Sequence, residues 1–163
     1  MFDIIKRLHL QYDYLAKARD LFLMQCYTGL AYSDLMVFDF TKCKQADGKY
    51  YYHAKRVKTD TDFTFQLLAG AGSVLKKYNF KLPCISNQKY NEYLKVIGMM
   101  VNVPNLHSHM GRATAATLFL SFGMPLNVVA KVLGHTNIRQ TQRYARTLNK
   151  DVYSAFDNID DKF

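Results

Sequence analysis

The chain has 163 residues, of which 49% are hydrophobic, and a formal net charge of +9. That length fits one domain with an ordinary buried core, and that composition excludes a disordered chain. No apolar run approaches the roughly 18–20 residues of a membrane-spanning helix, and the first residues lack the layout of a signal peptide.

Residues 13–28 are predicted to form a helix. Leu15, Ala18 and Leu21 follow one another at helical steps, and Gly29 supplies a stop. A short second helix over residues 31–36 is expected next. Its first turn would be capped by the side chain of either Thr28 or Ser33.

The pattern then changes to aromatic and β-branched residues, which favour strands. Three such segments predict an antiparallel meander, with an Asp-Gly turn at residues 46–48 and an Asp/Thr turn at residues 59–62. The predicted strands are residues 37–41, 49–57 and 63–67.

Helical patterns return in the second half of the chain. Breakers at Pro83, Pro104, Pro125 and Gly134 separate them. The predicted helices are residues 72–79, 87–101, 107–122, 126–133 and 138–148, with a last helix from 150 to about 158. Together these elements predict an α+β domain that is mainly helical and carries one small three-stranded antiparallel sheet.

The positive charge is concentrated in the middle of the chain. Between Phe63 and Lys150 there is one acid, Glu92, against eleven lysines and arginines. Acids gather instead near the two ends. A basic surface with acidic flanks predicts binding to a polyanion, and a solvated basic face is the plainer alternative. No basic amphipathic anchor helix favours a membrane surface instead.

The most informative pattern joins H-x-x-R, L-G-H and a tyrosine within 36 residues. His109 and Arg112 project from one face of a predicted helix, Gly134 presents His135 at a turn, and Tyr144 follows nine residues after His135. These groups suit attack on a phosphodiester without a metal. Arginine holds the non-bridging oxygens, imidazoles hydrogen-bond or carry protons, and the phenol oxygen attacks phosphorus. Taken singly, each has a plainer explanation as a helix cap, an ion-paired arginine or a packed tyrosine.

In this order and spacing, the pattern resembles the catalytic domain of the tyrosine recombinases, the phage integrase family, and is similar to the Bacteroides-type integrases. The resemblance runs from about Leu21 to about Leu148. It implies that Tyr144 attacks a DNA phosphate and forms a 3′-phosphotyrosyl link. Arg112 would balance charge on the transition state, while His109 and His135 would hydrogen-bond the phosphate or move protons.

Lys58 resembles the general acid of the family, which protonates the leaving 5′ oxygen. It follows the second predicted strand, among six basic residues from Lys42 to Lys58. Lys55 is the competing candidate, although it should point to the opposite face of the strand. The plainer alternative is a basic strand that faces solvent or the DNA backbone.

One position departs from the family pattern. Residues 28–35 read T-G-L-A-Y-S-D-L where T-G-L-R-x-S-E-L is usual, so Ala31 replaces the first catalytic arginine and Asp34 keeps the supporting acidic position. Removing one such oxyanion donor costs about 2.7–4 kcal/mol. We expect Arg56 to compensate, because it shares a strand face with Lys58 and a guanidinium reaches farther than an ammonium.

The resemblance also implies boundaries and partners. We expect a separate N-terminal DNA-binding domain to be absent, residues 1–12 to be a linker remnant, and residues 149–163 to form a C-terminal tail helix. The partners would be double-stranded DNA and other copies of the chain, as a tetramer around two duplexes, with neither a membrane nor a small-molecule substrate. DNA contacts are expected from Lys55, Lys131, Arg139, Arg143 and Arg146.

No carboxylate cluster, G-x-x-x-x-G-K motif or zinc-ligand spacing is present, so we expect no metal or nucleotide cofactor. The three cysteines are odd in number and form no C-x-x-C pair, which favours a reducing bacterial cytoplasm, at the nucleoid. The leading interpretation is a site-specific DNA recombinase. The alternatives are a type IB topoisomerase-like enzyme, and a DNA-binding relative that lost catalysis with Ala31 but keeps salt-sensitive duplex binding.

Overall fold

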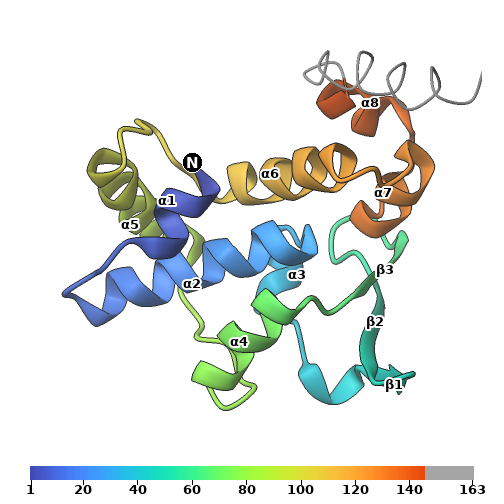
Figure 1. Ribbon diagram of the computed structural model, residues 1–163, viewed down its shortest axis with the longest axis horizontal. Helices are drawn as coiled ribbons and strands as arrows, with labels where there is room; N and C mark the ends of the chain where they lie inside the picture. The colour runs from blue at the N-terminus through green and yellow to red at the C-terminus, as the bar shows by residue number, and fades with distance from the viewer. Residues whose placement is uncertain (146–163) are drawn as a thin grey trace, which may run out of the picture.

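The computed structural model describes residues 1–145, and within that range it has eight α-helices and one three-stranded antiparallel sheet (Figure 1). The helices are α1 (Phe2–Arg7), α2 (Asp13–Thr28), α3 (Tyr32–Met36), α4 (Ala69–Lys77), α5 (Asn87–Met100), α6 (Ser108–Ser121), α7 (Leu126–Leu133) and α8 (Arg139–Ala145). The predicted mainly helical α+β domain is therefore confirmed. No helix in the described range is long and apolar enough to cross a membrane.

The central element of the main core is α2, which contacts α1, α4, α5 and α6 (Figure 1). Leu15, Leu21 and Phe22 are buried on it, so the helix is covered on several sides. It ends where predicted, because Gly29 adopts the left-handed conformation with φ of 74°. Helix α1 was not predicted from the sequence; its residue Ile5 is fully buried within the same core.

The predicted strand over residues 37–41 is wrong. A 3₁₀ turn, η1 (Phe40–Lys42), occupies part of it, and the edge strand is β1 (Lys44–Ala46). The side chain of Asp39 accepts hydrogen bonds from the backbone N–H of Thr41 at 3.0 Å and from its hydroxyl at 2.7 Å. This local turn offers the backbone an alternative to an extended ladder, so the aromatic pattern does not decide the conformation there.

The other two strands are confirmed, with β2 (Lys49–Lys55) pairing between β1 and β3 (Asp62–Gln66). Ala46 pairs with Lys49 across a two-residue turn, and Asp47 and Gly48 both have positive φ values of 50° and 72°, as an Asp-Gly hairpin requires. Strand β2 ends at Lys55, two residues earlier than predicted. The inner face of the sheet buries Tyr52, Phe63 and Phe65 in the main core.

A second, smaller core lies between α6 and α7, and β3 also contacts α7. Its buried members are Ala115, Ala116, Phe119, Val129 and Leu133, and the partly buried ring of Tyr144 on α8 packs against them. The tyrosine is thus placed by α6 and α7, the two helices that carry Arg112 and the turn before His135.

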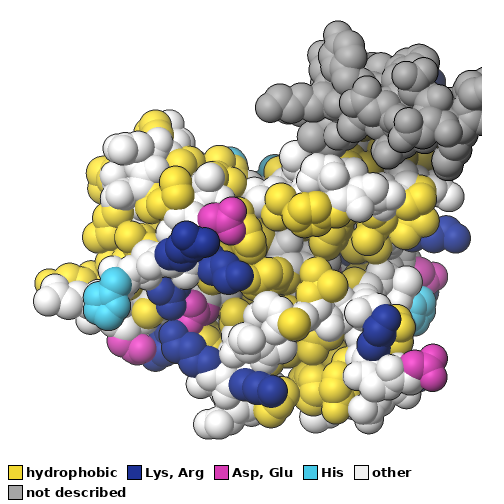
Figure 2. Space-filling model, viewed as in Figure 1, with side chains coloured by type: hydrophobic (Ala, Val, Ile, Leu, Met, Phe, Trp, Pro, Cys, Tyr) yellow, Lys and Arg dark blue, Asp and Glu magenta, His cyan; other side chains and the backbone are white. Residues whose placement is uncertain are grey.

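Basic side chains also gather away from these helices. Figure 2 shows Lys and Arg over the region where α1, α2 and α4 meet, and a cavity there is lined by Lys6, Arg19 and Lys77. The buried carboxylate of Asp20 accepts from Arg19, from Lys77 at 2.6 Å and from the hydroxyl of Tyr78 at 2.8 Å. Part of the positive charge therefore neutralises a buried acid and joins α2 to α4.

The close approach of α2 and α7 predicts a strong effect of Gly29→Ala. A Cβ at this position would lie 2.7 Å from Cδ2 of Leu133, and the left-handed conformation alone costs a non-glycine residue about 1–2 kcal/mol. We expect urea unfolding to show a loss of about 2 kcal/mol or more. Gly72→Ala is the matched control, since it lies within α4 with free space around it, and should stabilise by about 0.5–1 kcal/mol. Equal stabilities for the two variants would contradict this account.

Candidate active site

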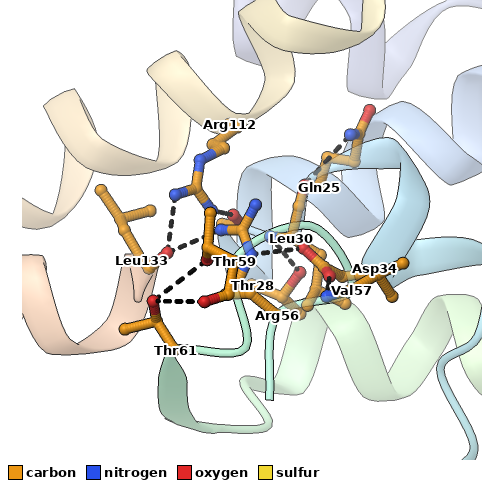
Figure 3. A network of polar contacts seen from close by, with 11 residues as sticks. Gln25, Thr28, Leu30, Asp34, Arg56, Val57, Thr59, Thr61, Arg112 and Leu133 are labelled. Carbon is orange, nitrogen blue, oxygen red and sulfur yellow. Dashed lines mark hydrogen bonds and ion pairs between the residues drawn. The ribbon is translucent and has the colours of Figure 1, made fainter. Parts of the chain in front are cut away.

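Arg112 is held by two backbone carbonyls. It follows His109 by one turn on α6 and is only 6% exposed. Its Nη1 donates to the carbonyl of Gly29 at 2.7 Å, and its Nη2 donates to the carbonyl of Leu133 at 2.6 Å (Figure 3). These acceptors lie at the C-terminal ends of α2 and α7, where helix carbonyls lack intrahelical partners. Burial, with the charge of Arg56, lowers the pKa of Arg112 to about 10, so it stays protonated at neutral pH.

Arg56 shares one of these acceptors. Its Nη1 donates to the carbonyl of Leu133 at 2.7 Å, and its Nε lies 2.6 Å from Oδ2 of buried Asp34 (Figure 3). The contact with Asp34 is an ion pair without well-aligned hydrogen-bond geometry. The other oxygen of Asp34 accepts from the backbone N–H of Val57 at 2.8 Å. Burial lowers the pKa of Arg56, and the carboxylate of Asp34 opposes that shift.

Two hydrogen bonds between buried polar groups hold the segment from Gly29 to Ala31 in place. The hydroxyl of Tyr90 donates to Oε1 of Gln25 at 2.8 Å, and Nε2 of Gln25 donates to the carbonyl of Leu30 at 3.0 Å. Neither Thr28 nor Ser33 caps α3 as predicted. Ala31 occupies the N-cap position, and no side chain hydrogen-bonds to the first turn of the helix from there. The hydroxyl of Thr28 instead donates to the carbonyl of Met24, which completes the end of α2.

Gly134 allows the aliphatic stem of Arg56 to pass close to the turn after α7. Its φ is 62°, the left-handed conformation that was predicted, and a Cβ there would lie 3.0 Å from Cγ and Cδ of Arg56. His135 follows, with its Nδ1 at 2.7 Å from the hydroxyl oxygen of Thr141. Burial, with the charges of Arg112 and Arg56, lowers the pKa of His135 to about 4, so this imidazole is neutral at pH 7.

Five of the six residues predicted to carry chemistry line one cavity of about 310 Å³. Within residues 1–145 no carboxylate lines this cavity, and its arginines and histidines give it the cationic character that a phosphate requires. Among residues 1–145 no three His, Cys, Asp or Glu side chains are grouped so as to hold a metal ion. The lining residues are Arg56, Thr59, His109, Arg112, Gly134, His135, Thr136, Gln140, Arg143 and Tyr144.

Lys58 lies at an adjoining cavity of about 210 Å³, which also contains Ala31 and shares His109 and Arg112 with the first. The argument that Arg56 and Lys58 share a strand face is wrong, because β2 ends at Lys55. Both lie in the turn that follows, which is closed by a bond from the backbone N–H of Arg56 to the carbonyl of Thr61 at 2.9 Å. The turn leads the two side chains into neighbouring cavities.

The residues predicted to contact DNA lie in different settings. Lys55 is exposed and its Nζ is 3.1 Å from Oδ2 of Asp60. Lys131 on α7 and Arg139 on α8 are exposed, and Arg143, also exposed, lines the main cavity. Arg146 lies outside the described residues, as do the predicted tail helix and its neighbours from residue 146 onward.

The sequence argument missed two parts of this site. The backbone carbonyls of Gly29 and Leu133 orient the arginines, and no residue-type pattern marks a carbonyl as a ligand. It also missed Thr141, a buried partner of His135. Its spacing of three residues from Tyr144 on a predicted helix was a usable signal, since residues three apart share a helix face.

Part of the sequence resembles known proteins. Residues 78–151 match the family model described as the phage integrase family, and this segment contains His109, Arg112, His135 and Tyr144. Transposase B from transposon Tn554 of Staphylococcus aureus is 28% identical over 91 residues, which are 56% of this chain and 14% of that protein.

Solved structures show the same fold. The XerH site-specific recombinase, in a post-cleavage complex with palindromic difH substrate, has a TM-score of 0.73 and 18% identity, and the match covers 94% of this chain and 49% of that one. The catalytic domain of bacteriophage HP1 integrase has a TM-score of 0.59 and 18% identity, with coverages of 93% and 95%. The chain therefore has the fold of a tyrosine-recombinase catalytic domain and spans about half of the XerH chain.

The lowered pKa of His135 predicts pH-dependent stability. The ordinary pKa is 6.5 and the folded value is about 4, so the unfolded chain takes up a proton first as the pH falls. The contribution of this group to the free energy of unfolding is full above about pH 6.5 and is lost as the pH falls toward 4.

Urea titrations at about pH 7 and about pH 4.5 should therefore show a larger loss of stability for the wild type than for His135→Gln. His9→Gln, at an exposed histidine between α1 and α2, is the control and should keep the wild-type response. If His135→Gln lost as much stability as the wild type between these two pH values, the conclusion that the pKa of His135 is lowered would be wrong.

Proposed function

We propose that this chain is the strand-cleaving domain of a site-specific DNA recombinase of the integrase type. The observation that carries the proposal is the shared cavity of Arg56, Arg112, His109, His135 and Tyr144. The phenol oxygen of Tyr144 attacks a backbone phosphate, forms a 3′-phosphotyrosyl link and releases a 5′-hydroxyl. The covalent link retains the energy of the phosphodiester, so a second strand's hydroxyl can religate the DNA without a further energy source.

Arg112 supplies the principal positive charge for the phosphate. Two of its nitrogens donate to carbonyls, and no carboxylate within residues 1–145 forms an ion pair with it. A guanidinium that is oriented by backbone dipoles keeps its full charge for a ligand and needs little reorganisation during the reaction. This arrangement suits a transition state in which negative charge grows on the phosphate oxygens.

Arg56 supplies the positive charge of the first catalytic arginine, whose position in the family pattern is occupied here by Ala31. Its Nε faces Asp34 and its Nη1 donates to Leu133, while its Nη2 has no hydrogen-bond partner among the described residues. That remaining nitrogen can donate to a phosphate oxygen in the cavity that Arg56 lines. Lys58, beside Ala31 in the adjoining cavity, is placed to protonate the leaving 5′ oxygen.

Double-stranded DNA is the proposed partner. The solved relatives include XerH bound to difH substrate and the Tn1549 transposon integrase in complex with circular intermediate DNA. Lys131 on α7 and Arg139 and Arg143 on α8 are exposed, and Arg143 lines the cavity, so these cations are proposed to contact flanking phosphates. Strand exchange between two duplexes would then use four copies of the chain.

A binding-only role is the second candidate, and the alanine at position 31 is the observation that favours it. Covalent trapping on a nicked suicide DNA substrate separates the two roles. We expect a denaturant-resistant protein–DNA adduct from the wild type and none from Tyr144→Phe, because the phenol oxygen is the nucleophile. Tyr51→Phe, at an exposed tyrosine on β2, is the matched control and should form the adduct. A wild-type chain that binds this DNA without forming an adduct would exclude cleavage by this domain.

The proposed role of Arg56, which is to donate to a phosphate oxygen, can be tested in the same trapping assay. Arg56→Ala should slow adduct formation by roughly 100- to 1,000-fold, the loss typical of one oxyanion donor. Lys95→Ala is the control for lost charge, because Lys95 is exposed on α5 and lines neither cavity of the site. If Arg56→Ala cleaved at the wild-type rate while Lys58→Ala did not cleave, compensation by Arg56 would be wrong.

A further inference from the structure

Thr141 links the turn that carries His135 to the helix that carries Tyr144. It is fully buried at 0% exposure, and its hydroxyl oxygen lies 2.7 Å from Nδ1 of His135. It precedes Tyr144 by three residues on α8, so the two side chains lie on one face of that helix. One hydroxyl thus contacts the imidazole and shares a helix face with the tyrosine.

The surroundings of Thr141 indicate which atom donates. The other threonines on described α-helices donate their hydroxyls to the carbonyl four residues earlier; these are Thr28 to Met24, Thr114 to Met110 and Thr117 to Ala113. Thr141 lies in the first turn of α8, and its hydroxyl makes no such bond within residues 1–145; its hydrogen-bond partner there is His135.

A buried hydroxyl requires an acceptor for its proton, since an unsatisfied buried donor is costly. Nδ1 of an imidazole accepts only when the ring proton is on Nε2. The hydroxyl of Thr141 therefore selects the neutral form of His135 that carries its proton on Nε2. The lowered pKa of the imidazole agrees with a neutral ring at pH 7.

We propose that Thr141 is a positioning residue, which holds His135 as an Nε2–H hydrogen-bond donor toward the phosphate and fixes α8 against the turn before it. This proposal rests on the proposed function and deepens it. It assigns His135 to donation of a hydrogen bond, and it makes the orientation of the imidazole and the placement of Tyr144 depend on one contact.

The test compares Thr141→Val, which removes the hydroxyl at nearly constant shape, with Thr141→Ser, which keeps it. Two-bond proton–nitrogen spectra of protein with nitrogen-15-labelled histidine report the tautomer directly, and His135→Gln identifies the signal among the five histidines. Wild type and Thr141→Ser should show the Nε2–H form. Thr141→Val should show a mixture of the two tautomers, or the Nδ1–H form.

Single-turnover cleavage of the nicked substrate gives the second readout. Thr141→Val should slow cleavage about tenfold, and Thr141→Ser should restore it to within about threefold of the wild type. Thr117→Val, which removes a hydroxyl bonded within α6 instead, should change neither the tautomer nor the rate. Circular dichroism establishes that each variant is folded before it is compared.

The outcomes separate the two proposals. An Nδ1–H tautomer in the wild type, or an unchanged Nε2–H tautomer in Thr141→Val, would overturn the role of Thr141 even if the adduct forms. A wild type without adduct would overturn the proposed function, while the spectra would still decide whether Thr141 sets the tautomer. Slow cleavage by Thr141→Ser with the Nε2–H form intact would also count against the positioning role.

Discussion

The carbonyl of Leu133 is the interaction on which the site depends. Two guanidinium groups, from Arg112 and Arg56, donate to this one oxygen at 2.6 and 2.7 Å. Like charges that lie so close repel each other, and the charge of Arg56 contributes to the lowered pKa of Arg112. The repulsion is opposed by the carbonyl end of α7 and, for Arg56, by Asp34. The fold thus brings two cations together by giving them a shared acceptor.

That acceptor is available because α7 ends at a glycine after Leu133, and α2 ends at a second glycine that packs against the Leu133 side chain. Gly29 ends α2 and Gly134 ends α7, both in the left-handed conformation. Gly29 packs so closely against Leu133 that a methyl group would not fit, and Gly134 leaves room for the stem of Arg56. The glycines therefore act at two levels, since they stop the helices and they permit the approach of the groups that form the site.

The sequence predicted much of this arrangement because periodic apolar faces and glycine stops are local signals. The helix over residues 13–28 and the Asp-Gly hairpin followed from such signals, while the candidate site residues came from the H-x-x-R, L-G-H and tyrosine pattern. The strand over residues 37–41 failed because Asp39 and Thr41 close a turn that competes with extension. Arg56 was selected by a strand-face argument that is wrong, yet it does line the cavity with Arg112. Its orientation is decided by Asp34 and Leu133, contacts that are distant in sequence and cannot be read from spacing.

The buried charge of Arg112 also has a consequence for the stability of the domain. Its charge is oriented by dipoles and is not neutralised by a carboxylate within residues 1–145, so part of the desolvation cost of this buried cation is left uncompensated. An anion that occupies the cavity removes part of this cost and binds the folded state alone. For any anion that binds this cavity, folding and occupancy are therefore linked equilibria, and the midpoint of thermal unfolding depends on the concentration of that anion. A stability measured in a buffer that contains such an anion therefore includes the free energy of anion binding, and a stability measured without it does not.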